Sequence, residues 1–267
     1  VFLGIFLPKE WNMFVEIFLI KQSWELSERR SRREKNINKD TMIRISFAYL
    51  YRIKINDKYL LIKSSRNTGK YQPIGGVYKY NDDEKDYLSK NYHIESDDKI
   101  KNDKTSKNDY RFYMKDKYIK EFVKHFETDI SNRENENDIT REFIEEVFED
   151  SSVDPKSMGV INYSFTSRFI EFSYQSIYRC YEFVLADIYE FKLDSNQEKI
   201  LNKIIYKNNK FLLATQKDIE TRGIKLSKRG NEDIISNNSW KILASKADEA
   251  TYSFNNKNFN VDLTKKK

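Results

Sequence analysis

Three glutamates, Glu142, Glu145 and Glu146, stand in one short stretch and are the residues of this chain best suited to metal chemistry. On a helix, Glu142 lies three and four residues before the other two, so all three carboxylates reach the same side. Crowded carboxylates repel each other, and a hard divalent cation such as Mg²⁺ or Mn²⁺, which prefers oxygen ligands, would relieve that repulsion. The alternative is an ordinary amphipathic helix with a solvated acidic face.

The adjacent pair Gly75-Gly76 is the second feature that could serve a ligand. The chain has only seven glycines, so two in succession are unusual here. A glycine lets the backbone approach a ligand closely or adopt a positive φ. The alternative is a plain turn between two strands.

Composition excludes several other kinds of site. A single cysteine, Cys180, excludes internal disulfides and cysteine-based zinc sites, and it favours a reducing, intracellular compartment. The only histidines are His93 and His125, which leaves little for a histidine-rich metal site or a Ser-His-Asp arrangement. The net charge of +6 over 267 residues is mild and mixed with many acids. It does not imply a nucleic-acid groove, and it suits a small anionic ligand or a membrane surface equally well.

The first 24 residues form an apolar segment that is interrupted by Pro8 and by several charged residues. A membrane-spanning helix needs about 20 nearly uncharged residues, and this segment does not meet that condition. An arginine-rich run follows within residues 25–40, which we interpret as a basic linker; such a run behind an apolar segment is typical of the cytoplasmic flank of a membrane anchor. Two interpretations stay open: residues 1–24 are the remnant of an anchor, or they form an apolar helix packed on the domain.

The rest of the chain predicts a domain over residues 41–250 that alternates strands and helices. A hairpin is expected around Asn56-Asp57, between strands at 43–49 and 59–62. Residues 81–133 are mostly polar and predict a surface insertion with one amphipathic helix at about 117–127. Thr140 or Asp138 is expected to cap the glutamate helix. Further strands are expected at 159–165, 169–174, 178–189 and 211–215, and 181–187 is expected to be central in the sheet. Helices are expected at 216–222 and 232–250. Residues 251–267 are expected to form a basic tail that is ordered only in part.

The order strand, Pro-x-Gly-Gly, then Arg-Glu-apolar-x-Glu-Glu resembles the Nudix hydrolase family. Its signature is G-x5-E-x7-R-E-U-x-E-E-x-G-U, where U is apolar; Gly75-Gly76 match its start, and residues 141–146 match its end. The chain departs from this signature in two ways. The interval between Gly76 and Arg141 is about 51 residues longer, and Phe148 stands where the signature has its last glycine.

A narrower group shares longer strings of this sequence. Residues 44–51 and 69–79, together with 132–134 paired with 141–143, are similar to the SMODS-associated Nudix domains, which occur with CD-NTase cyclases in bacterial antiphage defence of the CBASS type. Some members follow a transmembrane segment. The resemblance covers about residues 41–250 and implies an α/β (α+β) fold, a Nudix-type α/β/α sandwich with a mixed sheet, into which the excursion at 81–133 is inserted.

The resemblance also implies roles for particular residues. Glu142, Glu145 and Glu146, with Gly76, would bind Mg²⁺ or Mn²⁺ against a diphosphate, and Arg141 would orient a glutamate through an ion pair. The residues expected to contact substrate are Gly75, Gly76, Tyr71, Arg44 and Lys79, although ordinary strand surface is an alternative for the last three. Glu171 and Glu182 are candidates for a further acid from another strand.

The implied function is Mg²⁺-dependent phosphoanhydride hydrolysis of a nucleoside diphosphate-linked compound or a nucleotide signal, by an effector of bacterial antiviral defence. The domain would be cytoplasmic, with an anchor at the inner face of the membrane as one option. An alternative is a non-catalytic sensor that binds a nucleotide, such as a cyclic oligonucleotide from a partner cyclase, and contacts the membrane through its N-terminus. A purely structural α/β domain is the third hypothesis. Double-stranded nucleic acid is not an expected partner.

Overall fold

The computed structural model describes residues 23–64, 69–97, 108–128, 139–206, 208–224, 232–243 and 251–265, with only the backbone described for 251–257. Most of the apolar segment, residues 132–134 and the expected cap Asp138 lie outside the described residues. None of the helices in the described part of the chain combines the length and the apolar character needed to cross a membrane.

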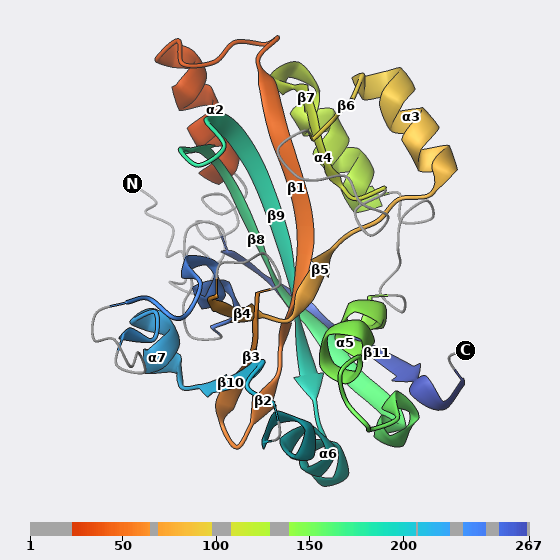
Figure 1. Cartoon of the computed structure of the whole chain (residues 1–267). Coiled ribbons are helices and arrows are strands. Elements are labelled where there is room, and N and C mark those ends of the chain that lie inside the picture. The colour runs from red at the N-terminus through yellow and green to blue at the C-terminus, as the bar shows by residue number, and fades with distance from the viewer. Residues whose placement is uncertain are drawn as a thin grey trace, which may run out of the picture.

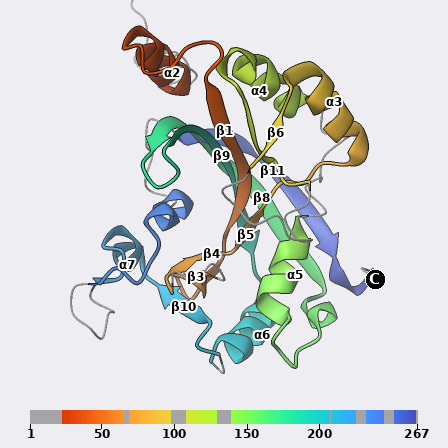
Figure 2. The same ribbon diagram turned by 45° about the horizontal axis from the view of Figure 1, so that its top comes forward.

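Within the described residues, seven strands form the larger sheet, which Figure 1 and Figure 2 show running through the centre of the molecule. Its order is β11-β8-β9-β1-β7-β6, and β5 also pairs with β1. Strand β1 runs parallel to β9 and antiparallel to β5 and β7, so the sheet is mixed, as predicted. The strand bounds are β1 Met42–Arg52, β5 Gly75–Val77, β6 Glu95–Ser96, β7 Arg111–Lys115, β8 Val160–Gln175, β9 Cys180–Lys192 and β11 Thr251–Asp262.

Strand β1 contributes side chains to both faces of this sheet. Its alternate side chains Ile43, Ile45, Phe47, Tyr49 and Tyr51 are completely buried, as expected of a strand whose successive side chains point to opposite faces. They pack on helices α4 (Ile119–Thr128) and α5 (Thr140–Phe148), with centroid distances of 5.1 Å for Phe47–Phe122 and 6.3 Å for Tyr51–Phe143.

The opposite face of the sheet receives the short helix η4 (Asn237–Ile242). Arg52 on β1 donates from Nε to the backbone oxygen of Ile242 at 2.6 Å, and the rings of Phe169 and Trp240 meet edge to face at 5.5 Å. Helical segments thus cover both faces of a mixed sheet, and the predicted α/β/α arrangement is confirmed.

A smaller sheet carries the predicted hairpin. It consists of β2 (Lys54–Ile55), β3 (Lys58–Lys63), β4 (Tyr71–Pro73) and β10 (Phe211–Ala214). Asn56 and Asp57 form the turn with positive φ values of 49° and 59°, the geometry of a two-residue hairpin loop. The predicted pairing of 43–49 with 59–62 is wrong, because the chain leaves the large sheet near Ile53 and β3 pairs with β2, β4 and β10 instead.

The polar excursion is more ordered than a surface loop. It contains α3 (Asp82–Tyr92), the edge strand β6 and its neighbour β7, the turn η1 (Asp116–Tyr118) and the predicted helix α4. Glu84 is 1% exposed; its carboxylate accepts from Tyr110 Oη at 2.9 Å and lies 3.0 Å from His125 Nε2. These partners stand 26 and 41 residues away in the chain. The sequence around Glu84 therefore shows only its polarity, which is why a surface position was predicted.

Several other expectations need correction. Most of the expected linker is helix α2 (Ser23–Arg33), and the expected tail contributes β11, which pairs with β8, and η5 (Leu263–Lys265). The two strands expected at 159–174 are one strand, β8, with an irregularity between Phe165 and Ser167. The predicted helix at 232–250 is limited to η4 among the described residues. Helix α7 (Gln216–Glu220) was predicted, whereas η2 (Pro155–Met158) and α6 (Ser195–Tyr206) were not.

Helix α2 packs on the sheet through Trp24, which is 7% exposed and meets Phe183 edge to face at 4.8 Å. We expect Trp24→Ala to lower the free energy of unfolding by about 3 kcal/mol, because it removes a large buried side chain. Leu26→Ala on the same helix is the matched control, since Leu26 is 47% exposed, and it should change stability by less than about 0.5 kcal/mol. Urea unfolding measures both; equal effects would mean that α2 behaves as a linker.

Candidate functional site

Helix α5 is anchored by its apolar face in the core and carries the glutamates on its other side. Phe143, Val147 and Phe148 are buried, Glu142 and Glu146 are half-buried, and Glu145 is exposed. Phe148 takes the position of the signature glycine, and its ring centroid lies 5.8 Å from that of Phe143. The apolar stripe therefore turns the acidic side of the helix away from the core.

The start of α5 differs from the expectation. The N-cap is Ile139, without a side-chain cap, and Thr140 is the first helical residue. Tyr51 on β1 donates its hydroxyl to the backbone oxygen of Ile139. This bond fixes the first turn of the glutamate helix against the central strand.

Arg141 pairs with two of the glutamates, whereas the resemblance implied an ion pair with one. Its Nη2 is 2.9 Å from Glu142 Oε1, and its Nη1 is 3.0 Å from Glu145 Oε2. The two ion pairs hold both carboxylates on one side of α5.

The two glycines lie directly against this helix. Gly75 and Gly76 pair with Leu50 and Tyr49 of β1, and the Gly75 N–H donates to Glu146 Oε2 at 3.2 Å. A Cβ at Gly76 would come within 2.5 Å of Glu142 Cγ, and one at Gly75 within 2.2 Å of the Tyr49 carbonyl oxygen. Side chains at these positions would separate β5 from α5 or β1, so the close approach requires glycine.

The electrostatics of the site are set by burial. Burial raises the pKa of Glu146 to about 8; Glu142 and Glu145 add to the rise, and the Gly75 N–H opposes it. A carboxylate held among other acids in a poorly solvated position is costly to ionise. A cation in contact with it would remove much of that cost.

Asp109 is a site residue that the sequence interpretation missed. It lies within the excursion, just before β7, where an isolated bridge pairs it with Lys79. Burial raises its pKa to about 6, and the charge of Glu142 contributes to the rise, against Arg111, Lys79 and Arg141. Only the pairing of the excursion with the chain after Gly76 reveals this placement, since the motif spacing contains no signal for it.

The donor set fits a hard divalent cation, although the side chains are not yet gathered around one point. Among the described residues, no three His, Cys, Asp or Glu side chains are arranged to hold a metal ion. Arg141 holds Glu142 and Glu145, while Glu146 faces the Gly75 N–H. Carboxylate oxygens beside a backbone segment are the ligands that Mg²⁺ and Mn²⁺ prefer. For the three glutamates to bind one ion, their side chains would have to rotate towards a common point.

The other expected substrate residues are not all brought to the glutamates. Lys79 lies 3.7 Å from Asp109 Oδ1 and so stands near the site. Tyr71 is in the small sheet, where its hydroxyl donates to the Asn209 backbone oxygen at 2.9 Å.

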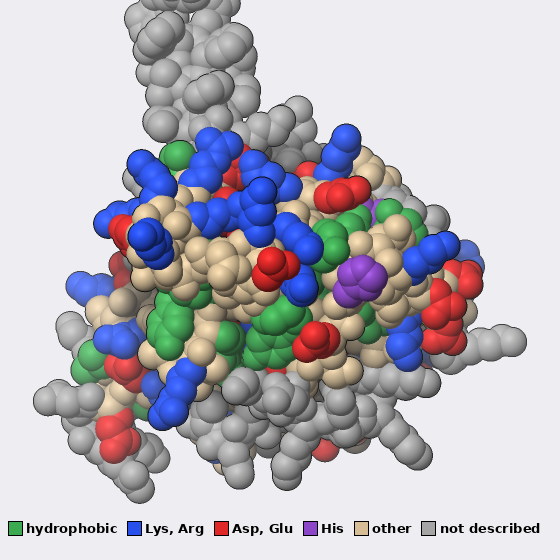
Figure 3. All heavy atoms as spheres, turned by 90° about the horizontal axis from the view of Figure 1, so that it is seen from above, with side chains coloured by type: hydrophobic (Ala, Val, Ile, Leu, Met, Phe, Trp, Pro, Cys, Tyr) green, Lys and Arg blue, Asp and Glu red, His purple; other side chains and the backbone are tan. Residues whose placement is uncertain are grey.

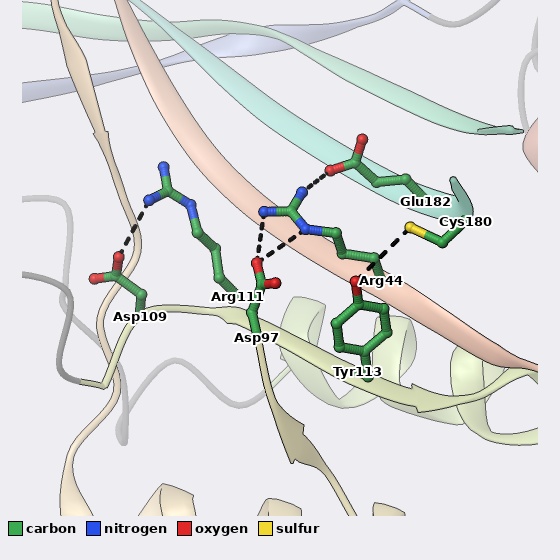
Figure 4. Close-up of polar contacts among 7 residues, drawn as sticks. All are labelled: Arg44, Asp97, Asp109, Arg111, Tyr113, Cys180 and Glu182. Carbon is green, nitrogen blue, oxygen red and sulfur yellow. Dashed lines mark hydrogen bonds and ion pairs between the residues drawn. The ribbon is translucent and has the colours of Figure 1, made fainter. Parts of the chain in front are cut away.

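Arg44 is held elsewhere in the sheet. It is 2% exposed, donates to Asp97 Oδ2 at 2.7 Å and pairs with Glu182 (Figure 4). Its guanidinium also lies over the Tyr178 ring. It precedes Tyr49 by five residues on β1, roughly 16 Å along a strand. Glu182 is thus the partner of Arg44. Glu171, the other candidate acid, lies on β8, where its charge acts on Lys241.

Comparison with known families decides the identity of the domain. A family model described as the SMODS-associated NUDIX domain matches residues 42–243. The chain belongs to this Nudix family. No curated protein and no solved structure matches it.

The matched range of this Nudix domain includes β5, α5 and the whole excursion between them. The long interval between the two halves of the signature therefore belongs to the family domain. Nudix domains generally use divalent metal ions and act on nucleotide derivatives, which agrees with the chemistry of the site.

The pKa of Glu146 predicts an unusual pH dependence. Between the ordinary value of 4.5 and the folded value of about 8, the folded protein binds a proton that the unfolded chain lacks. The stability of the metal-free protein should therefore fall as pH rises through this window. Glu146→Gln removes that dependence, and at pH 9 it should be more stable than the wild type by about 1–2 kcal/mol.

Chemical unfolding with chelator present, at pH 6 and pH 9, measures this difference. Glu149→Gln is the matched control, because Glu149 is exposed at the end of the same helix. Identical pH dependence in the wild type and Glu146→Gln would contradict the poorly solvated placement of Glu146.

Proposed function

We propose that this Nudix domain is a Mg²⁺-dependent hydrolase that cleaves the phosphoanhydride of a nucleoside diphosphate-linked compound, as an effector in CBASS-type antiviral defence. The observation that supports it best is the contact of the half-buried Glu146 with the Gly75 N–H, beside Glu142 and Gly76. That contact joins the two halves of the Nudix signature across the excursion.

Each residue has a distinct role in this proposal. Glu142, Glu145 and Glu146, with the Gly76 backbone, would hold the ion, which would supply charge neutralisation of the diphosphate and activation of a water. Arg141 orients Glu142 and Glu145 through the two ion pairs already described. The glycines let β5 lie directly against α5 and β1, which keeps the Gly75 N–H within reach of Glu146.

The defence role rests on the family description. The domain belongs to a group defined by its association with SMODS proteins, so a nucleotide signal from a partner cyclase is the proposed activator. A cyclic oligonucleotide is the form of signal that we propose to test.

The activity is tested with the purified chain, Mg²⁺ and a panel of nucleoside diphosphate-linked compounds, including ADP-ribose. We expect turnover that a chelator abolishes, and a loss of roughly 100-fold or more in Glu145→Gln and Glu146→Gln, since metal-site residues typically carry effects of at least this size. Glu149→Gln on the same helix should retain full activity. Absence of turnover with every compound, or turnover unchanged in both site variants, would refute the hydrolase.

A non-catalytic sensor is the second candidate. Phe148 in place of the signature glycine, and the engagement of two glutamates by Arg141, are the observations that favour it. Calorimetry with cyclic oligonucleotides and ADP-ribose separates the two functions: binding without product supports the sensor, whereas metal-dependent product formation supports the hydrolase.

We further propose that the domain works at the inner face of the membrane, with α2 towards the lipid. Figure 3 shows Lys and Arg side chains gathered on the end of the molecule that carries α2 and the start of β1. The side chains of Arg29 and Arg30 on α2 are exposed, as are those of Lys117 in η1 and Lys120 in α4. In the sequence, this helix directly follows the apolar segment. Basic residues next to an apolar segment favour anionic lipid headgroups.

The full chain should bind vesicles that contain anionic phosphatidylglycerol more tightly than zwitterionic ones, and added salt should weaken this binding. Arg30→Glu with Arg33→Glu should weaken it about tenfold or more, because each basic residue near such a surface contributes about 1 kcal/mol. The exposed pair Lys199→Glu with Lys203→Glu on α6 is the control of equal charge change. Equal binding by both double variants would rule out α2 as the contact.

A further inference from the structure

We propose that the tip of the β8–β9 hairpin, with Ile177 at its apex, inserts into the headgroup region of an anionic bilayer beside α2. This inference deepens the proposed membrane contact of α2, on which it rests, by adding an apolar anchor to a contact made of charges. The proposed hydrolase activity does not depend on it.

The tip of this hairpin exposes large apolar side chains. Residues 176–179 form the turn between β8 and β9. Ile177 in this turn is 86% exposed, and Tyr174 near the end of β8 is 55% exposed. Turns are usually built from Gly, Pro, Asn, Asp and Ser, so local turn chemistry does not account for an isoleucine at the apex.

A strip of aromatic rings connects α2 with this tip. Trp24 of α2 meets Phe183 at 4.8 Å between ring centroids. Phe183 pairs with Phe172 in the strand register, and Tyr181 pairs with Tyr174. The Tyr181 ring stacks on Phe172 at 5.5 Å and meets Tyr174 edge to face at 5.4 Å. The strip therefore begins in the core beneath α2 and ends at the exposed Tyr174.

The strand register places the tip at the basic end of the molecule. Strands β1 and β9 are parallel, with Arg44 opposite Glu182, so the turn that precedes β9 lies at the same end of the sheet as the start of β1. Met42, the first residue of β1, pairs with Lys115, and α2 packs against β8. Figures 1 and 2 both show the end of the hairpin beside α2. This is the end where Lys and Arg side chains gather in Figure 3.

The outward side of α2 is both apolar and basic. Trp24 and Glu28 are buried towards the sheet, whereas Leu26 is 47% exposed. Arg29 and Arg30 follow Leu26 by three and four residues, so they share its side of the helix, and their side chains are 54% and 75% exposed.

This combination suits a lipid surface. Apolar and aromatic side chains next to arginines are typical of protein surfaces that lie in the interface of an anionic bilayer. The centre of a protein–protein interface is depleted of most charged residues, whereas here the few apolar side chains stand among basic ones. An anionic bilayer is therefore the partner that the chemistry of this end favours.

The test is binding of the full chain to phosphatidylglycerol vesicles, measured by cosedimentation. We expect Ile177→Ser to weaken binding about tenfold, because an isoleucine side chain no longer enters the lipid. The salt dependence should stay unchanged, since no charge changes, and Ile177→Trp should bind at least as tightly as the wild type. Tyr206→Ser is the matched control, because Tyr206 is 94% exposed on α6, at the opposite end of the molecule from α2 in Figure 1. It should bind as the wild type does.

Fluorescence quenching tests the depth of the tip directly. With brominated phosphatidylglycerol in the vesicles, the emission that Ile177→Trp adds to that of the wild type should be quenched. The emission that Tyr206→Trp adds should not be quenched. Equal quenching of the two, or quenching of neither, would contradict the insertion of the tip.

The remaining outcomes separate this inference from the proposals on which it rests. Wild-type binding by Ile177→Ser, together with weaker binding by Arg30→Glu with Arg33→Glu, would overturn the tip as an anchor and leave the contact of α2 standing. A wild-type chain that binds neither anionic nor zwitterionic vesicles would overturn both. Turnover of nucleotides in solution is measured without lipid, so it decides the hydrolase independently of these results. Thermal unfolding of Ile177→Ser should match that of the wild type, because the side chain is exposed.

Discussion

The bond between the Gly75 N–H and the carboxylate of Glu146 depends on most of the surrounding fold. It forms because β5 lies on β1 and because Tyr51 ties the start of α5 to the same strand. Phe143 and Phe148 hold the other side of the helix in the core. The glycines are required, since a Cβ at either position would meet Tyr49 or Glu142 at less than 3 Å. A backbone segment and an acidic helix can meet this closely only where the side chain between them is missing.

The excursion between the two halves of the signature is part of this architecture. It returns to the large sheet through β7, and its helix α4 covers the central strand. The buried Glu84 joins α3 to α4 through His125 and to the chain before β7 through Tyr110. A buried acid with hydrogen-bonding partners is tolerated, whereas an unpaired one would be expelled. The excursion is therefore a fixed part of the domain, and it places Asp109 opposite Lys79.

The charged residues of the sheet fall into two kinds. Arg44 with Asp97 and Glu182, and Arg168 with Asp187, form buried pairs with short contacts, and these join strands and the segments around them. The ion pairs of Arg141 on α5 involve partly exposed side chains, and those of Asp109 are longer. The pKa values of Glu146 and Asp109 lie above their usual range. The first kind stabilises the fold, because each charge is neutralised where it stands. In the second kind, acids lie close together at a cost in free energy, and a bound cation would reduce that cost.

The sequence by itself determined the family, the acidic helix and the glycine pair, because these depend on short-range spacing. The positions of Glu142, Glu145 and Glu146 on a helix follow from its 3.6-residue repeat, and the Asn56-Asp57 turn follows from local conformational preference. Only the tertiary structure decided that Arg44 is a buried structural residue, that the polar excursion packs into the sheet, and that Asp109 lies opposite Lys79. These placements depend on partners far apart in the chain, such as Glu182 for Arg44 and Lys79 for Asp109. Local polarity has no information about such partners, because it does not specify which strands will pair.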